Sequence, residues 1–347
     1  MKVLRYEGAY TMSYLDVPCP EPKEHEVRIK IKAVSICGSD LSGYRGINSL
    51  RVAPLIMGHE FAGVIDACGT GVTELRPGMR VTVNPSMYCG VCENCKSGNY
   101  NLCDRKTVPG TSVGGVNVDG AMAQYLCVRE SSVIPLTDGI SMEEASVLEP
   151  LAVSLHGVKR AGELNGKRVV VIGAGPIGLL AMQCIRDRGA ASLIAMDLVD
   201  ARLHTARLCG ATQTLNLREQ ALDEVWAMTD GCGADVVYDC VGNEKSVEQA
   251  TQIVRNNGKI VVIGMAAAQI TFPIKRFVAH EFQMLGSYQY LDEMKEGMRL
   301  VTERKIDLAP IITSVLPLSS GAEAFASLCS ASPKDVKIVL VPEEKSS

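Results

Sequence analysis

The sequence has 347 residues, of which 47% are hydrophobic and 21% charged, and at roughly 150 residues per domain this length predicts two domains. Lysine and arginine number 35 against 39 aspartate and glutamate, a net charge of −4, so the charge balance favours neither nucleic acid nor a membrane surface as a partner. Glycine and proline interrupt the longest apolar stretch, Val169–Ile185, which argues against a transmembrane span. The first ten residues lack the apolar core of a signal peptide, so we expect a cytoplasmic protein.

The first half of the chain reads as short strands. Residues Glu26–Val34 alternate polar and apolar with period two, as a half-buried strand does. Three further strands are predicted between glycine and proline residues, at Phe61–Ala67, Arg80–Val83 and Ala123–Val128. This pattern predicts a barrel or sandwich of short antiparallel strands.

The pattern changes near residue 165, where apolar strands begin to alternate with helices. The predicted strands are Val169–Ile172, Ser192–Met196, Ala234–Tyr238 and Lys259–Ile263, and the predicted helices are Pro176–Arg188, Asp200–Cys209 and Glu244–Arg255. Such alternation is typical of a parallel sheet covered on both faces. A helix at Leu291–Glu303 and a strand at Lys337–Val341 remain, too little for a third domain, so we expect this tail to pack on the first half.

A glycine-rich turn, Gly173-Ala174-Gly175-Pro176-Ile177-Gly178, follows the first apolar strand and opens a helix. In this setting the GxGxxG pattern predicts a pyrophosphate bound at the helix N-terminus. Asp197 ends the next strand, nineteen residues after Gly178, where its carboxylate would accept hydrogen bonds from the ribose hydroxyls of NAD and repel the 2′-phosphate of NADP. The alternative is a purely structural turn, with Asp197 as a helix cap.

Thirteen cysteines in a chain without an export signal indicate thiols and a metal rather than disulfides. Cys89, Cys92, Cys95 and Cys103 form a compact run whose spacing suits four thiolates around one zinc ion. With all four positions filled by protein, such a site is closed to substrate and structural. An iron–sulfur cluster is the alternative, but the spacing departs from the ferredoxin patterns.

A second set of metal-binding residue types is dispersed along the chain: Cys37, His59, Glu60 and Glu149. Taken singly, Cys37 could be a small buried apolar residue, His59 a hydrogen-bonded core histidine, and Glu149 a surface charge.

Together these residues resemble the zinc-dependent medium-chain dehydrogenase/reductase superfamily over essentially the whole chain. The matching segments are Cys37-Gly38-Ser39-Asp40, Gly58-His59-Glu60, the four-cysteine run, residues 119–125, Glu149-Pro150-Leu151 and Gly173–Gly178. The resemblance implies an α/β protein of two domains. Residues 1–152, completed by 288–347, would form a GroES-like β-barrel catalytic domain, and residues 153–287 a Rossmann domain with a doubly wound parallel sheet.

Within the superfamily the sequence is similar to the polyol dehydrogenase branch, which includes sorbitol, galactitol-phosphate and sugar-acid dehydrogenases. The resemblance implies that Cys37 and His59 bind a catalytic zinc, with Glu60 and Glu149 completing its shell directly, through water or in alternation. Gln289 stands where sorbitol dehydrogenases often have arginine, and Leu41-Ser42 lacks the histidine of threonine dehydrogenases. These departures leave the substrate open.

The resemblance also assigns residues to the cofactor site. These are Gly173, Gly175, Pro176, Ile177, Gly178, Asp197, Arg202, Ile263, Gly264, Ser287 and Tyr288.

We therefore expect two zinc ions per chain and an NAD-dependent oxidation of a secondary alcohol of a polyol, sugar phosphate or sugar acid to the ketone, in a homodimer or homotetramer. Zinc would act as a Lewis acid on the substrate hydroxyl. Ser39 is either the first member of a proton relay or a hydroxyl that satisfies local backbone. The alternatives are a threonine or 2,3-butanediol dehydrogenase and, from another class, a non-catalytic zinc- and dinucleotide-binding redox sensor. A nucleic-acid-binding zinc ribbon is disfavoured by the net charge.

Overall fold

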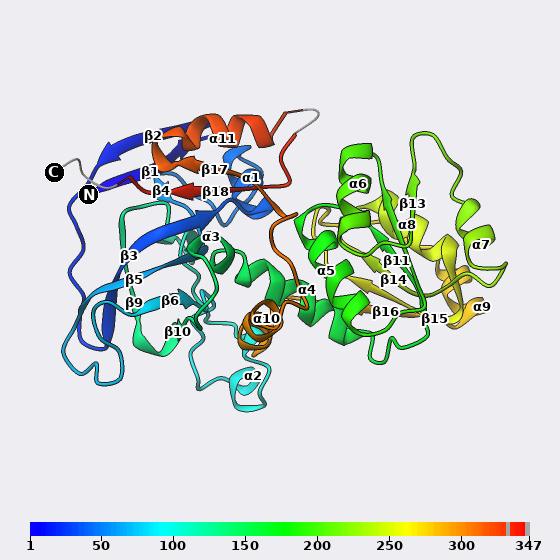
Figure 1. The fold of residues 1–347 in the computed structure, drawn as a ribbon, viewed down its shortest axis with the longest axis horizontal. Coiled ribbons are helices and arrows are strands. Elements are labelled where there is room, and N and C mark those ends of the chain that lie inside the picture. Colours follow the sequence, from blue (N-terminus) through cyan, green and yellow to red (C-terminus); the bar gives the residue numbers. More distant parts are fainter. Residues whose placement is uncertain (331–333, 344–347) are drawn as a thin grey trace. The chain divides into compact units, whose positions relative to one another are not determined.

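The computed structural model describes residues 1–330 and 334–343. The chain forms two compact units, residues 1–149 with the described residues from 312 onward, and residues 150–311. Figure 1 traces both units. Within the described residues, no helix has the length and apolarity needed to cross a bilayer.

The first unit is mostly β. Its elements are β1 (Lys2–Gly8), β2 (Thr11–Asp16), β3 (Glu26–Ser35), α1 (Gly38–Tyr44), β4 (Leu55–Ile56), β5 (Glu60–Cys68), β6 (Arg80–Val83), α2 (Glu93–Lys96), β7 (Thr111–Val113), β8 (Val116–Val118), β9 (Tyr125–Arg129), β10 (Val133–Pro135), α3 (Met142–Ala145), β17 (Ile312–Pro317), α11 (Gly321–Leu328) and β18 (Lys337–Val341). In the described part of this unit the strands form sheets ordered β2-β1-β4, β10-β6-β5-β3-β18-β17 with β9 also on β3, and β7-β8. Every pairing is antiparallel except β17 with β18.

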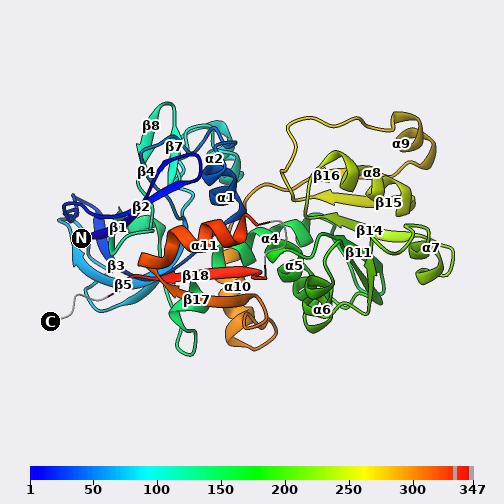
Figure 2. The ribbon, with the colours of Figure 1, turned by 90° about the horizontal axis from the view of Figure 1, so that it is seen from above.

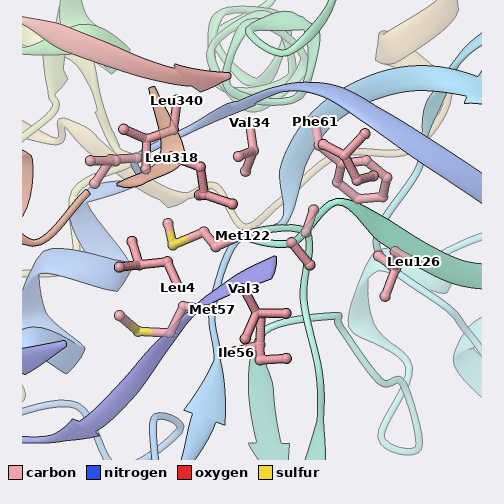
Figure 3. Packing of buried hydrophobic residues seen from close by; sticks show 14 of the residues in the cluster. Val3, Leu4, Val34, Ile56, Met57, Phe61, Met122, Leu126, Leu318 and Leu340 are labelled. Atoms are coloured by element: carbon pink, nitrogen blue, oxygen red, sulfur yellow. The ribbon is translucent and has the colours of Figure 1, made fainter. Parts of the chain in front are cut away.

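Strand β3 is central because it pairs with β5, β9 and β18. Buried and half-buried residues alternate from Glu26 to Ala33, as the period-two pattern predicts, whereas the last three residues of the strand are all buried. The core beside it gathers side chains from distant parts of the chain, including Leu4, Met57, Met122 and Leu340 (Figure 3). This packing joins the last described strand to the first ones.

The second unit is a parallel α/β structure. Its elements are β11 (Arg168–Ile172), α5 (Pro176–Asp187), β12 (Ser192–Asp197), α6 (Asp200–Leu208), β13 (Gln213–Asn216), α7 (Glu224–Met228), β14 (Ala234–Asp239), α8 (Glu244–Ile253), β15 (Val254–Val262), α9 (Ile274–His280), β16 (Gln283–Gly286) and α10 (Glu293–Thr302). Helix α4 (Leu148–Arg160) enters this unit from the first. All six strands are parallel, in the order β13-β12-β11-β14-β15-β16.

This strand order is that of a doubly wound sheet: successive strands are added on one side of β11 up to β13, and from β14 onward on its other side. Helices α5 and α6 pack along β11 to β13, whereas α8 and α9 pack along β14 and β15 (Figure 2). Right-handed crossovers in opposite directions place these two groups on opposite faces of the sheet. Ligands of such sheets bind outside the strand ends at this change of side, which is where the glycine-rich turn lies.

Two expectations differ from the structure. Residues 150–152 and 288–311, expected in the first domain, belong to the second unit, because α10 packs against α4 and its Glu293 pairs with His156 and Lys159. The helix predicted to end at Arg255 ends at Ile253, and β15 already begins at Val254. The tail that packs on the first unit therefore begins at Ile312 and consists of β17, α11 and β18.

Candidate active site

Cys37 caps the N-terminus of helix α1. Its Sγ accepts the backbone N–H of Ser39 at 3.4 Å and the Ser39 hydroxyl at 3.3 Å. Asp40 completes the cap, since its Oδ2 accepts the Cys37 N–H at 3.3 Å. This arrangement is a capping box in which a thiol replaces the usual hydroxyl or carboxylate, and it fixes the direction of the Cys37 side chain.

His59 enters the site through a glycine turn ahead of β5. Gly58 has φ +100° and its missing Cβ would lie 2.9 Å from the Met122 side chain, so only glycine leads the chain into β5 along this path. The Nδ1 of His59 is buried, has no hydrogen-bond partner among the described residues, and lies 3.7 Å from Asp40 Oδ1. A buried ring nitrogen without a partner is costly, and a bound ligand is one explanation for it.

Glu60, the first residue of β5, is buried in an ion pair. Its Oε2 accepts hydrogen bonds from the Ser35 hydroxyl and from Lys337 Nζ. The Lys337 side chain is only 2% exposed, and its Nζ also donates to the carbonyl of Ile36 at 3.1 Å. Burial lowers the pKa of Lys337, but the charges of Glu60, Cys37 and Glu149 and the hydrogen bond to Glu60 together hold that pKa above its usual value.

Glu149 lies in the first turn of α4 and is buried rather than a surface charge. Burial raises the pKa of the Cys37 thiol well above its usual range, with Glu60 and Glu149 adding to the rise and Lys337 opposing it. Glu149 is therefore close enough to influence Cys37 electrostatically.

Cys37, His59 and Glu60 come together, as expected. Within the described residues their ligand atoms lie within 4.8 Å of one another, and Glu149 is outside this group. A thiol, an imidazole nitrogen without a partner and a carboxylate are a donor set that zinc binds. A cation would also stabilise the thiolate that burial disfavours. These residues therefore fit a zinc ion.

The four-cysteine run folds into a loop that contains the single turn of α2. The sulfur atoms of Cys92 and Cys95 are 3.4 Å apart, those of Cys92 and Cys103 3.8 Å, and those of Cys89 and Cys95 4.0 Å. Four sulfurs at about 2.3 Å from a tetrahedral zinc would lie about 3.8 Å apart. Backbone N–H groups of residues 91 and 92 lower the pKa of Cys89 to about 6. Both the spacing and these amides fit a closed zinc site.

The glycine-rich turn leaves a bare backbone surface at the start of α5. Gly173 has φ +92°, and a Cβ on Gly178 would lie 1.9 Å from the Gly173 carbonyl oxygen, so both positions need glycine. A Cβ on Gly175, the N-cap of α5, would meet nothing within 4 Å, and Pro176 takes the first helical position. Open space beside the N-terminus of a twelve-residue helix fits a phosphate group.

Asp197 ties this turn to the end of β12. One carboxylate oxygen accepts the Ala174 N–H at 2.7 Å, and the other accepts the N–H groups of Leu198 at 2.7 Å and Val199 at 3.0 Å. Asp197 thus sits beside the glycine turn as expected, and Arg202 is half-buried on α6. Ile177, which follows Pro176 in the glycine-rich turn, is also half-buried.

The remaining cofactor candidates lie at the ends of the neighbouring strands. Ile263 and Gly264 follow β15, and both donate their N–H to the Asp239 carbonyl. Ser287 follows β16, and its buried hydroxyl has no partner among the described residues. Burial raises the pKa of Tyr288 beside it. These positions share the strand-end edge on which the glycine turn lies, which is the edge where a doubly wound sheet binds its ligand.

Comparison with known proteins identifies the family. Residues 23–138 match the alcohol dehydrogenase GroES-like domain, and residues 176–303 match the zinc-binding dehydrogenase domain. The chain is 34% identical over 331 residues to sorbitol dehydrogenase of Bacillus subtilis (strain 168), covering 94% of this chain and 93% of that protein. The chain belongs to the zinc-dependent medium-chain dehydrogenases.

Other medium-chain dehydrogenases agree with this assignment. A probable D-xylulose reductase A of Aspergillus fumigatus (strain CBS 144.89 / FGSC A1163 / CEA10) is 36% identical over 329 residues, covering 92% of this chain and 91% of that protein. The crystal structure of galactitol-1-phosphate dehydrogenase from Escherichia coli is similar with a TM-score of 0.91 and 30% identity, over 99% of this chain and all of that one. The resemblance to the polyol dehydrogenase branch and the two-part fold class are confirmed. The protein is an enzyme of this family, whose cofactors are zinc and NAD(P) and whose substrates are small molecules.

Sequence reasoning missed Lys337, the buried partner of Glu60. In sequence it is an ordinary lysine at the start of an apolar strand, 277 residues from Glu60. A lysine at the first position of a strand is normally expected to be exposed to solvent. No spacing rule links Lys337 to Glu60. Only the pairing of β18 with β3 reveals the contact.

Proposed function

We propose that this enzyme oxidises a secondary alcohol of a polyol, sugar phosphate or sugar acid to the ketone with NAD. The grouping of Cys37, His59 and Glu60 is the observation that carries the proposal, because a purely structural protein needs the four-cysteine site but not a second, incomplete one. The relatives named above act on sorbitol, xylulose and galactitol 1-phosphate, which supports the substrate class. A non-catalytic redox sensor would leave this second group of ligands without a role.

When bound, zinc would supply Lewis acidity for a substrate hydroxyl, and NAD would supply the acceptor for the hydride of the carbon that bears this hydroxyl. Cys37 and His59 would hold the metal together with Glu60. Lys337 and Ser35 orient the Glu60 carboxylate through one oxygen, which leaves its other oxygen for the metal. Glu149 supplies a further negative charge near Cys37.

The residue proposed to move the alcohol proton is Ser39. Its hydroxyl lies 3.3 Å from the Cys37 sulfur, within the ligand loop formed by residues 37–40. A hydroxyl both accepts and donates, so Ser39 Oγ can take a proton from a substrate while it releases its own proton to solvent. The alternative role, satisfying local backbone, has less support because the hydroxyl donates to the Cys37 sulfur and accepts from Arg51, two side chains.

We propose NAD rather than NADP as the cofactor and two zinc ions per chain. Asp197 already accepts three backbone N–H groups, which holds its negative charge beside the glycine turn. A 2′-phosphate would meet that charge, whereas ribose hydroxyls would donate to it. The ratio of kcat/KM for the two cofactors tests the preference, and metal analysis of unchelated protein tests the zinc count. A preference for NADP would show that Arg202 outweighs the carboxylate.

We also propose that the chain forms a homo-oligomer through its second unit. Strand β16 is an edge strand of the parallel sheet, and helix α9 carries two apolar side chains, Ile274 and Val278, that are 60% and 65% exposed. Exposed apolar side chains and edge strands are both typical features of an interface. Light scattering after size exclusion should give a dimer or tetramer, and Val278→Asp should shift it toward the monomer.

A substrate screen tests the proposed reaction directly. NADH formation would be followed with polyols, sugar phosphates, aldonates, threonine and butanediols, at one enzyme and NAD concentration. The proposal expects a secondary alcohol of the first three groups to give the highest kcat/KM. Turnover of threonine or 2,3-butanediol alone would replace the substrate class, and no turnover in protein with two zinc ions would favour the sensor.

Glu149→Gln tests whether Glu149 takes part. The variant keeps size but removes a negative charge near Cys37, so we expect a large fall in kcat with zinc content and NAD binding retained. Glu24→Gln, a change of the same kind at an exposed position, should alter rate and stability within the range of surface substitutions, about 0.5 kcal/mol. A near wild-type kcat for Glu149→Gln would remove Glu149 from the mechanism.

A further inference from the structure

Arg51 is a buried cation that the proposed chemistry does not use. It lies in the loop between α1 and β4, and its side chain is 3% exposed. Burying a guanidinium is costly unless its N–H groups are paired. The hydrogen bonds of this arginine offset the cost of burying its charge, and its side-chain partners are residues of the ligand loop.

The guanidinium spans two of these residues. Its Nε and Nη2 donate to Asp40 Oδ1 at 3.2 and 3.1 Å, and Nη2 also donates to the Ser39 hydroxyl oxygen at 3.0 Å. Nη1 reaches the carbonyl of Leu50 at 3.4 Å. The planar fork of an arginine is suited to hold a carboxylate and a hydroxyl in one fixed geometry.

Helix α1 makes room for this side chain by carrying glycine at position 43. A Cβ there would lie 2.5 Å from Arg51 Cγ and 2.8 Å from its Cβ. No side chain fits at position 43 unless the Arg51 stem moves. Gly43 and Arg51 are thus matched in shape, and Gly43→Ala displaces the guanidinium without removing its charge.

The contact with Arg51 determines the direction of the Ser39 hydroxyl. A guanidinium can only donate, so Ser39 Oγ accepts from Arg51 and its own hydrogen is left to point elsewhere. In this structure that hydrogen is directed at Cys37 Sγ, 3.3 Å away. The result is a one-way chain of hydrogen bonds from Arg51 through Ser39 to Cys37.

The same guanidinium fixes Asp40 against the two ligand residues. The Asp40 oxygen that accepts from Arg51 lies 3.7 Å from His59 Nδ1, and its other oxygen accepts the Cys37 N–H. At 3.7 Å the carboxylate does not hydrogen-bond the ring, but its negative charge acts on it. Charged groups placed behind a metal-binding histidine affect the strength of metal binding. Arg51 therefore acts on both Cys37 and His59 through Asp40, to which it is hydrogen-bonded directly.

We propose that Arg51 is a positioning residue of the zinc site, which orients the Ser39 hydroxyl and holds Asp40 in place behind His59 and Cys37. The consequence for catalysis rests on the proposed function, but the consequence for metal binding does not. Arg51→Lys keeps the charge and loses the fork, so it should weaken zinc retention at one of the two sites by about 10- to 100-fold. It should lower kcat more than the KM for NAD.

The experiment compares Arg51→Lys, Gly43→Ala and the control Arg45→Lys, an exposed arginine six residues earlier in the chain. Zinc release to a chelator is measured for each variant, together with the visible absorption of the cobalt-substituted protein. We expect both loop variants to release one zinc faster and to shift the cobalt bands, while the second zinc and the Arg45→Lys variant behave as wild type. Methylguanidine should restore part of the zinc retention to Arg51→Ala.

Two results would overturn the inference. One is wild-type zinc retention and cobalt bands in Arg51→Lys and Gly43→Ala. The other is equal loss of both zinc ions with a general fall in Tm, which would indicate a structural role only. If wild-type protein with two zinc ions oxidises no alcohol, the proposed function fails, and the zinc and cobalt measurements still decide the role of Arg51.

Discussion

Glu293 is expected to make a large contribution to the stability of the second unit. It begins α10, and its Oε1 lies 3.0 Å from Lys159 Nζ and 3.2 Å from His156 Nδ1, both on α4. Its Oε2 accepts the Leu291 N–H at 2.6 Å. Burial alone raises the pKa of Glu293, but His156, the Leu291 N–H and Lys159 together hold it at about 2.

The size of the effect follows from this pKa. The ordinary value is 4.5, and each unit of difference corresponds to about 1.4 kcal/mol, so the charged form contributes about 3 kcal/mol at neutral pH. Because the folded pKa is depressed, this contribution is complete above the unfolded value of 4.5 and is lost as the pH falls toward 2. Glu293→Gln keeps a polar acceptor, and we expect it to cost about 2–3 kcal/mol at pH 7.

Urea unfolding of the zinc-loaded protein provides the measurement. Trp226 is the single tryptophan and lies on α7, so its fluorescence reports on the second unit. The difference between wild type and Glu293→Gln should be smaller at pH 4 than at pH 7 by about 1 kcal/mol.

A control at the C-cap of the same helix separates this ion pair from ordinary surface charge. Glu303→Gln removes the exposed partner of Arg299 and should change stability by less than about 0.5 kcal/mol. A Glu293→Gln variant within 0.5 kcal/mol of wild type at pH 7, or a difference that does not shrink at pH 4, would refute the reasoning.

Three further substitutions have definite expected outcomes. Cys95→Ser should lower the zinc content by close to one ion per chain and the Tm of the first unit, while the catalytic zinc is retained, as metal analysis and calorimetry would show. Gly178→Ala forces a methyl group against the Gly173 carbonyl, so NADH binding followed by fluorescence should weaken at least about tenfold, at a stability cost of about 1–3 kcal/mol. Tyr238→Phe removes the buried hydroxyl that donates to the Val158 carbonyl at 3.0 Å, and urea unfolding should show a loss of about 1–3 kcal/mol. Unchanged zinc content, NADH affinity or unfolding free energy in the respective variant would contradict each expectation.

The sequence predicted best what depends on local pattern. Strands β6 and β18 were predicted with the bounds that the structure has, and β11, β12 and α5 within one residue. In these segments, apolar periodicity and flanking glycines determine the element without help from distant residues. The four-cysteine run belongs to the same class, because its spacing alone brings the sulfurs together.

The sequence predicted least where a contact spans the chain. The buried pairs of Glu60 with Lys337 and of Asp40 with Arg51 follow no spacing rule, since each depends on the approach of separate elements. The start of β15 was missed because Asn257, with φ +55°, and Gly258 look like the end of a helix. The positions of Cys37, His59 and Glu60 were assigned by resemblance, and the structure brings them together without assigning their roles.

The buried contact between Lys337 and Glu60 also orders events during synthesis. The second unit lies between residues 150 and 311, so the ribosome completes all of it before β18 exists. Until Lys337 emerges, the first unit holds a carboxylate without its cation and a central strand β3 without one neighbour. Domains generally fold as units during translation, and here the unit that begins first is the last to be completed. A nascent chain arrested before residue 337 would therefore carry a complete second unit and a first unit in which Glu60 lacks its cation.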